Sequence, residues 1–289
     1  MSGELLEVDH VTKSFAIGGL FGRGRFNAVD DVSFTLHANN PEILAIIGES
    51  GSGKTTLARM VLNASQPTSG AIRFRGEPLR QARGRRRRLE FIRQIQPILQ
   101  NPYEAFNPLK RVDRYLYASA AHLAGARSQK ARDEAADAAL QKVGLSLAEV
   151  KGRFPHELSG GQLQRAAIAR ALISSPSLIV ADEPVSMVDA SLRMSIVSLF
   201  RRLHDDLKVS ILYITHDLAT AYTISDRVII MQKGKVVETG LAREVLTHPQ
   251  HPYSIQLKEA VLSPDDVGKH RLTAERSQAA AAERAQTGK

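Results

Sequence analysis

The sequence contains no cysteine among its 289 residues. This absence excludes disulfide bridges, thiolate metal sites and cysteine-held clusters, and it fits a reducing cytoplasm. No apolar run approaches the ~18–20 residues that a helix needs to cross a bilayer. The first ten residues, MSGELLEVDH, carry acidic side chains and lack the basic start and long apolar core of a secretory signal. We therefore expect neither a membrane span nor a signal peptide.

Composition and charge favour a globular protein with a basic surface. The hydrophobic fraction is 43% and the charged fraction 24%, both typical of globular proteins, and the length allows one large domain with attachments. The net charge is +9, and a dense group of arginines lies in RQARGRRRR, residues 80–88. Such a run can bind nucleic acid or anionic lipid head groups. No aromatic residues interleave with these arginines as base-stacking platforms would, so a solvated surface segment is favoured and nucleic-acid binding is not.

Short apolar patterns predict most of the strands. A continuous apolar run at 42–48 is typical of a strand buried on both faces, and 177–184 and 209–217 repeat this pattern, each ending in polar groups. Residues 226–240 predict a hairpin that turns at Lys233 and Gly234. Further strands are expected over 5–15, 26–37 and 70–79, with a Gly/Arg loop over 16–25.

Helical spacing follows the first buried strand and fills the middle of the chain. Residues 54–63 predict a helix, and 103–172 are largely helical. An amphipathic stretch over 128–144 is expected to end at Gly144. The alanine-rich, polar tail over 273–289 predicts a frayed helix or disorder.

The sequence GESGSGKT, residues 48–55, satisfies the P-loop pattern G-x-x-x-x-G-K-[ST] and lies between a predicted strand and a predicted helix. The glycines let the backbone wrap a β-phosphate, Lys54 would neutralise the β- and γ-phosphates, and the Thr55 hydroxyl would bind Mg²⁺. A glycine-rich turn with a surface lysine is the alternative, which the strand–helix context disfavours. The predicted nucleotide-binding residues are Gly48, Glu49, Ser50, Gly51, Ser52, Gly53, Lys54, Thr55 and Thr56.

Two acidic residues end the second buried strand. Asp182 can hold Mg²⁺ and so complete the metal shell begun by Thr55, and Glu183 can polarise an attacking water as general base. A strand-ending surface pair is the weaker alternative. A P-loop alone leaves kinases, GTPases and motor ATPases open, but the Asn-Lys-x-Asp motif that reads guanine is missing, which counts against a GTPase.

His216 and Gln100 are expected at the same edge of the sheet. Parallel strands deliver their carboxyl ends to one edge, so the strands that end near Gly48, Asp182 and His216 should converge on one nucleotide. His216 could then reach the γ-phosphate. The Gln100 amide could contact Mg²⁺ or the attacking water.

A second anion-binding arrangement occurs more than a hundred residues after the P-loop. Ser159, Gly160, Gly161 and Gln162 open directly into an alanine-rich helical stretch. Free backbone N–H groups and the positive end of a helix dipole would face the same point there.

In these motifs the sequence resembles the ATP-binding cassette (ABC) family, over about residues 5–257. The motifs that carry the resemblance occur in the order and with the approximate spacing that they have in the family. They are the P-loop, Gln100, the SGGQ element, Asp182–Glu183, Asp189 and His216. The resemblance implies an α/β P-loop NTPase (RecA-like) core with an antiparallel β subdomain and an inserted helical subdomain. The implied divisions are 1–100 with 175–245 for the core, 101–174 for the helical subdomain, and 246–289 for a C-terminal extension with a disordered tail.

The resemblance also implies ATP and Mg²⁺ as ligands and a head-to-tail pair of cassettes. In such a pair the SGGQ element of one chain closes the P-loop site of the other, and Asp189 links the two sites across the interface. Adenine should stack on Phe15, with Phe26 as a weaker candidate. The family more often has Ala-Leu where this chain has Met187-Val188, which implies altered packing with intact function.

Three stretches resemble the dipeptide/oligopeptide importer branch: residues 20–34, the NPYEAFNP that follows Gln100, and the His-Pro-Tyr segment in 246–257. A proline-set turn after the core is the alternative for the last of these. The resemblance is to the second, F-type cassette of that branch. It implies a second ATPase subunit as heterodimer partner, two transmembrane permease subunits, an extracytoplasmic substrate-binding protein acting indirectly, and a peripheral location at the cytoplasmic face of the membrane.

Other interpretations stay open. The same branch carries oligosaccharides and nickel as well as peptides. A soluble ABC ATPase of nucleic-acid repair or translation is a rival, although such proteins resemble tandem cassettes or carry long insertions. A non-hydrolytic interaction module is disfavoured by the full catalytic set.

Overall fold

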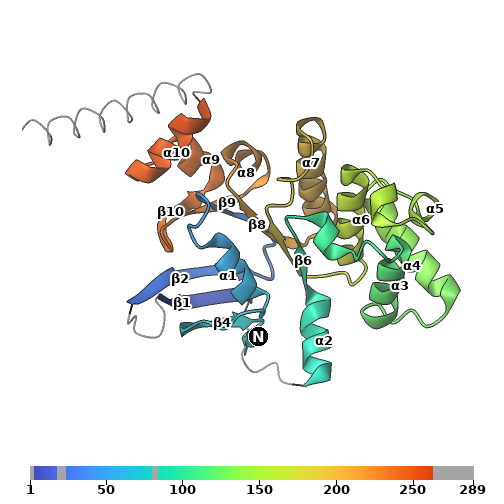
Figure 1. The fold of residues 1–289 in the computed structure, drawn as a ribbon. Helices are drawn as coiled ribbons and strands as arrows, with labels where there is room; N and C mark the ends of the chain where they lie inside the picture. Colours follow the sequence, from blue (N-terminus) through green and yellow to red (C-terminus); the bar gives the residue numbers. More distant parts are fainter. Residues whose placement is uncertain (1–2, 18–23, 80–83, 263–289) are drawn as a thin grey trace, which may run out of the picture.

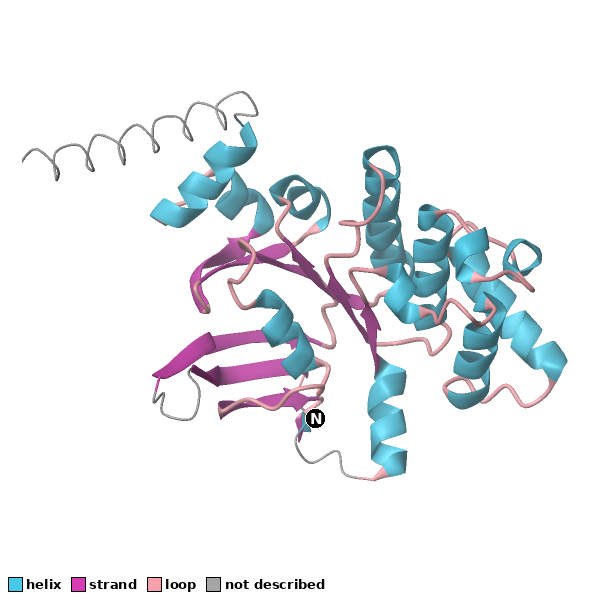
Figure 2. Ribbon diagram, in the orientation of Figure 1, coloured by secondary structure: helices cyan, strands magenta, loops and turns pink. Residues whose placement is uncertain are grey.

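The computed structural model describes residues 3–17, 24–79 and 84–262, and it holds two sheets with helices packed around them (Figures 1 and 2). The larger sheet has six strands in the order β10-β9-β3-β8-β7-β6. Strands β9, β3, β8, β7 and β6 run parallel, and β10 pairs antiparallel with β9. Its strands are β3 (Ile43–Ile47), β6 (Ile95–Ile98), β7 (Leu178–Asp182), β8 (Ser210–Thr215), β9 (Arg227–Gln232) and β10 (Lys235–Leu241).

The centre of this sheet is buried on both faces, as its continuous apolar runs predict. Every residue of β3 and of β8 is buried. Side chains of β3 alternate between the two faces, so that Leu44 and Ile46 join one apolar cluster while Ala45 and Ile47 join another. The hairpin between β9 and β10 turns at Lys233 and Gly234 with positive φ angles of 48° and 85°, which confirms the expected turn.

The smaller sheet is antiparallel, in the order β2-β1-β4-β5. Helix α1 (Lys54–Val61) lies between the two sheets and buries Leu57, Met60 and Val61. The strands are β1 (Glu4–Ile17), β2 (Gly24–His37), β4 (Ser69–Phe74) and β5 (Glu77–Pro78). This sheet is the expected antiparallel β subdomain.

The helices of the middle of the chain pack together beyond β6 (Figure 1). Their common core includes Leu116, Leu140 and Leu163 and continues onto one face of the larger sheet. Gly144, with φ 75°, follows α4 where the sequence predicts its end. The elements are α3 (Val112–His122), α4 (Gln129–Lys142), α5 (Leu147–Val150) and α6 (Gly160–Leu172), with short 3₁₀ turns at Pro102–Ala105 and Pro155–Glu157.

The remaining helices lie on the outer face and edge of the larger sheet. Helix α7 (Ala190–Leu207) contributes Phe200 to the core of the helical group. Helices α8 (Leu218–Ile224), α9 (Ala242–Thr247) and α10 (Pro252–Leu262) form a separate apolar cluster with β3 and β9. The two sheets, the central α1 and the helical group confirm the expected α/β P-loop fold.

The structure contains elements that the sequence analysis did not predict, among them helices α7, α8 and α9. Residues 85–94 form a helix, α2 (Arg85–Gln94), none of whose residues is buried. Residues 252–262 form α10, where only a turn was considered. The loop at 18–23, the start of the arginine run at 80–83 and the tail at 273–289 lie outside the described residues. Within the described ranges, no helix is both long and apolar enough to cross a membrane.

The packing of α1 predicts a stability effect. Leu57 is fully buried between the two sheets, so Leu57→Ala should lower the free energy of unfolding by about 2–5 kcal/mol through lost burial and a residual cavity. The control is Leu109→Ala, at a side chain that is 84% exposed, which should change that energy by no more than about 0.5 kcal/mol. Urea unfolding measures both, and equal effects would contradict this packing.

Candidate functional site

The register of the parallel strands brings the predicted site residues to one edge. Ile47 of β3 pairs with Thr215 of β8, and Ile214 of β8 pairs with Asp182 of β7. Ala181 of β7 pairs in turn with Ile98 of β6. The segments that follow these strands therefore emerge side by side, as carboxyl ends of parallel strands do.

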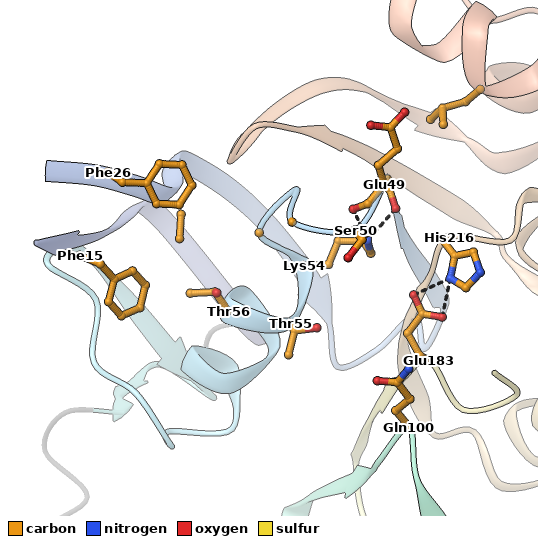
Figure 3. A pocket seen from close by; sticks show the side chains of 15 residues that line it. Phe15, Phe26, Glu49, Ser50, Lys54, Thr55, Thr56, Gln100, Glu183 and His216 are labelled. Atoms are coloured by element: carbon orange, nitrogen blue, oxygen red, sulfur yellow. Dashed lines mark hydrogen bonds and ion pairs between the residues drawn. The ribbon is translucent and has the colours of Figure 1, made fainter. Parts of the chain in front are cut away.

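A cavity of about 770 Å³ opens at this edge, and it collects residues from seven separate segments (Figure 3). Figure 3 shows Phe15 and Phe26 at one end and Gln100, Glu183 and His216 at the other, with the P-loop between them. The lining residues are Phe15, Phe26, Ala28, Gly48, Glu49, Ser50, Gly51, Gly53, Lys54, Thr55, Thr56, Gln100, Glu183, His216 and Leu257. The volume suits a nucleotide-sized ligand.

The P-loop is held tightly against neighbouring backbone, which explains two of its glycines. A Cβ at Gly53 would lie 2.1 Å from the Ala28 carbonyl oxygen, and φ at Gly53 is 105°. A Cβ at Gly48 would lie 2.2 Å from the Met231 carbonyl oxygen. The loop leads into α1 at Lys54, so the free N–H groups of the first turn are available to an anion.

The Lys54 ammonium lies inside the P-loop. Its Nζ donates hydrogen bonds to the carbonyl oxygens of Gly48 at 2.6 Å and of Glu49 at 2.8 Å. Burial lowers the pKa of Lys54, and the negative charges of Glu183 and Asp182 oppose this shift. A cation in these surroundings is poorly solvated and strongly attracts added negative charge.

Thr55 and Asp182 bring two oxygen ligands together at the edge of the cavity. The Thr55 hydroxyl donates to the Asp182 carboxylate at 3.3 Å. Burial raises the pKa of Asp182, the Thr55 hydrogen bond lowers it, and the charge of Glu183 raises it. Within residues 3–17, 24–79 and 84–262, no group of three or more His, Asp or Glu could hold a metal alone. Hard oxygen ligands from one hydroxyl and one carboxylate fit Mg²⁺, which usually takes its other ligands from phosphates and water.

Glu183 combines an unusual backbone with a directed carboxylate. Its φ of 50° lies in the left-handed region, and its N–H donates to the Ile214 carbonyl oxygen at 2.9 Å. A non-glycine residue in this region carries strain that the surrounding structure must offset, and such residues concentrate at functional sites. The largely buried carboxylate pairs with His216 Nδ1 at 2.7 Å (Figure 3). The sequence analysis predicted both residues at the site but not this contact.

Both candidate adenine platforms line the cavity. Phe15 and Phe26 are direct cross-strand partners in β1 and β2, and both rings are about half exposed. Lys13 Nζ lies 5.4 Å from the centroid of the Phe15 ring. Because the two residues pair directly, Phe26 is as good a candidate as Phe15 to stack on adenine, although the sequence analysis considered it the weaker one.

The SGGQ element lies apart from this cavity, since none of its four residues lines it. Ser159 caps α6: its hydroxyl accepts from the Gln162 N–H at 3.2 Å, and the Gln162 side-chain oxygen accepts from the Ser159 N–H at 3.0 Å. The capping hydroxyl accepts in this arrangement and keeps its own proton to donate. Beyond the helix and the chain neighbours, no described atom lies within 4 Å of a Cβ built at Gly160.

Asp189 also lies outside the cavity. It is the exposed residue at the N-terminus of α7, and its carbonyl oxygen accepts from the backbone N–H groups of Leu192 and Arg193. Its predicted role at an interface stays a prediction.

The site includes residues that the sequence analysis did not place there. The Tyr253 hydroxyl accepts a hydrogen bond from the Glu49 N–H at 3.0 Å, and Leu257 lines the cavity. Both belong to α10. The His-Pro-Tyr segment is visible in the sequence, but nothing local shows that it reaches the P-loop.

Comparisons with known proteins show the family to which this chain belongs. Residues 29–186 match the family described as ABC transporter. The chain is 38% identical over 265 residues to the oligopeptide transport ATP-binding protein OppF of Bacillus subtilis, covering 92% of this chain and 85% of that protein. It is 36% identical over 267 residues to AmiF of Streptococcus pneumoniae, an oligopeptide transport ATP-binding protein, covering 92% and 84%. Among solved structures, the dimeric post-hydrolysis state of the ATP-binding cassette MJ0796 bound to ADP and Pi has a TM-score of 0.72 and 26% identity, covering 82% of this chain and 99% of that one.

The Glu183 carboxylate generates a prediction for ATP turnover. Glu183→Gln keeps the size of the side chain but removes the base, so kcat for ATP hydrolysis should fall at least ~100-fold. Nucleotide binding should persist, because the P-loop is unchanged. Phosphate release and equilibrium binding of a fluorescent ATP analogue measure the two effects. Glu134→Gln, at an exposed position of α4, is the control, and undiminished hydrolysis by Glu183→Gln would contradict the assignment.

Proposed function

We propose that this chain, which belongs to the ABC transporter family, is the ATP-binding and ATP-hydrolysing subunit of a peptide importer. One observation carries the proposal: a single cavity brings together the P-loop, Gln100, Glu183 and His216, with Asp182 bonded to Thr55 at its edge. Each of these groups has a part in transferring a phosphoryl group to water.

The chain's own residues would divide the work of hydrolysis. Lys54 and the N–H groups of the P-loop bind the phosphates and neutralise their charge. Glu183 takes a proton from the water that attacks the γ-phosphorus, while the bond to the β–γ bridging oxygen breaks and ADP and phosphate are released. His216, paired with Glu183, orients that carboxylate and can reach the γ-phosphate. Thr55, Asp182 and Gln100 would hold Mg²⁺, which supplies further charge neutralisation when bound.

The SGGQ element supports a site shared between two cassettes. Ser159 and Gly160 are exposed, and the N–H groups of the first turn of α6 have no acceptor within their own helix. The described chain gives no steric reason for glycine at Gly160. An external group that must approach the backbone closely would explain this choice. We therefore assign Ser159, Gly160, Gly161 and Gln162 to the γ-phosphate at a partner's P-loop, and Asp189 to the interface.

The partners follow from this assignment and from the relatives. The solved ATP-binding cassette with bound ADP and Pi is a dimer, which supports a second cassette here, and we propose a different chain as that partner. The relatives OppF and AmiF are oligopeptide transport ATP-binding proteins, which supports two permease subunits and, through them, a substrate-binding protein. A chain with these partners would lie at the cytoplasmic face of the membrane.

The shared site predicts an effect that crosses the interface. Gly160→Asp places an acid at the first position of α6, where the helix dipole favours it, but it repels a phosphate. In an importer that contains a partner cassette, vanadate trapping of labelled nucleotide should be lost at the partner's P-loop and kept at this chain's own. Gln129→Asp, which adds the same charge to the first turn of α4, should change neither site. Loss at this chain's own P-loop would contradict the assignment.

The cargo class is tested in cells. Cells that lack this chain should lose uptake of a labelled tripeptide, and the wild-type chain, but not Glu183→Gln, should restore it. Uptake of labelled nickel and of an oligosaccharide serves as the comparison. Intact peptide uptake with loss of either other cargo would overturn the peptide assignment, and an RNase- or DNase-sensitive complex without permeases would overturn the transport role.

A further inference from the structure

The peptide group between Gly48 and Glu49 is held from both sides. Its carbonyl oxygen accepts the 2.6 Å hydrogen bond from Lys54 Nζ, and its N–H donates the 3.0 Å hydrogen bond to the Tyr253 hydroxyl. The N–H and C=O of one peptide point in opposite directions and share one plane. Fixing the N–H therefore fixes the direction of the carbonyl that holds the phosphate-binding lysine.

Tyr253 is well placed to act as a fixed support. Its ring is 4% exposed and belongs to the apolar cluster that includes Ile47, the residue before the P-loop. Burial raises the pKa of Tyr253, the Glu49 N–H lowers it and the Glu49 charge raises it, so the group stays a neutral phenol near pH 7. A ring locked by packing gives its hydroxyl one position.

The start of α10 is itself anchored to the sheet. The Glu238 carboxylate of β10 accepts from the N–H groups of Gln250 at 2.9 Å and His251 at 3.2 Å. Burial alone would raise the pKa of Glu238, but the hydrogen bonds that it accepts, including those from the Gln250 and His251 N–H groups, outweigh this effect and lower the pKa. His251 Nδ1 accepts in turn from the Tyr253 N–H at 3.2 Å. The His-Pro-Tyr segment is thus a braced turn that starts α10 at Pro252.

A second residue of α10 reaches the same cavity. Leu257 lies one helical turn after Tyr253 and lines the cavity at the P-loop. Residues four apart lie on the same face of a helix. The same face of α10 therefore contacts the P-loop through the Tyr253 hydrogen bond and borders the ligand cavity through Leu257.

We propose that Tyr253 is a positioning residue for ATP binding, and that α10 is a structural part of the nucleotide site rather than an appendage to the core. The inference rests on the proposed function only in taking ATP as the ligand. Tyr253 acts through the Gly48–Glu49 peptide: it holds the P-loop in the form that presents Lys54 and the backbone N–H groups to the phosphates. It touches neither the substrate nor the reacting atoms.

The test is Tyr253→Phe, which keeps the buried ring and removes only the hydroxyl. The Glu49 N–H then lacks its acceptor, and the Kd for a fluorescent ATP analogue should rise about three- to tenfold. The KM for ATP should rise by a similar factor, with kcat within about twofold, because Glu183 and His216 are untouched. Tyr222→Phe, at an exposed tyrosine of α8, is the matched control and should change neither quantity.

Hydrogen exchange separates positioning from general destabilisation. Exchange of the Glu49 amide should accelerate in Tyr253→Phe, while amides of β3 and β8 keep their protection. Global loss of protection, or unchanged Glu49 exchange with unchanged Kd, would overturn the inference. A wild-type chain that binds no ATP would overturn the proposed function as well, whereas normal ATP affinity in Tyr253→Phe would overturn this inference alone.

Discussion

The parallel pairing of β3 with β8 and of β8 with β7 is the constraint on which the site depends. A shift of one residue would displace a strand end by about 3.3 Å, more than the 2.7 Å that separates Glu183 from His216. A strand with one polar face has its register fixed by the need to turn that face to water. Strands β3 and β8 are buried on both faces, so this cannot set their register. Packing and the bonds beyond the strand ends must do so, among them the bond from the Glu183 N–H to the Ile214 carbonyl oxygen. Glu183, which has a left-handed backbone, thus also joins the end of β7 to β8 through its N–H.

Charge balance is the second constraint on the site. Lys54 is buried beside Glu183 and Asp182, and each carboxylate favours the charged form of the lysine. Removing charges from water is costly unless they are paired and hydrogen-bonded. Here the loop carbonyls, the Thr55 hydroxyl and His216 provide the bonds. The Lys54 ammonium thus lies close to the carboxylates of Glu183 and Asp182 without forming a direct ion pair with either. Each group therefore remains available: the lysine to a triphosphate, and the carboxylates to a cation or a water.

Local patterns predict the parts of this protein that depend on neighbours in the chain. The P-loop, the three buried strands and the helix that Gly144 ends follow from spacing and glycine chemistry within about ten residues. Helix α2 escapes prediction because half of its ten residues are arginines and it buries no residue fully, although Phe91 packs partly buried against the core. Contacts that join distant segments escape as well. Tyr253 and Glu49 are separated by 204 positions, and the equal standing of Phe26 with Phe15 appears only when β1 and β2 pair.

The P-loop and the SGGQ element both contain glycines, but contacts within the chain explain only those of the P-loop. In the P-loop, side chains at Gly48 or Gly53 would collide with backbone oxygens of Met231 or Ala28, so the fold alone requires glycine there. A side chain at Gly160 would meet no described atom beyond its own helix and neighbours, so no contact within the described chain requires glycine there. Together with the distance of the SGGQ element from the cavity, this supports one cradle completed within the chain and a second offered to another molecule. Closure by a bound triphosphate would then link the stability of the pair to the presence of ATP, since anything that binds the closed state preferentially stabilises it.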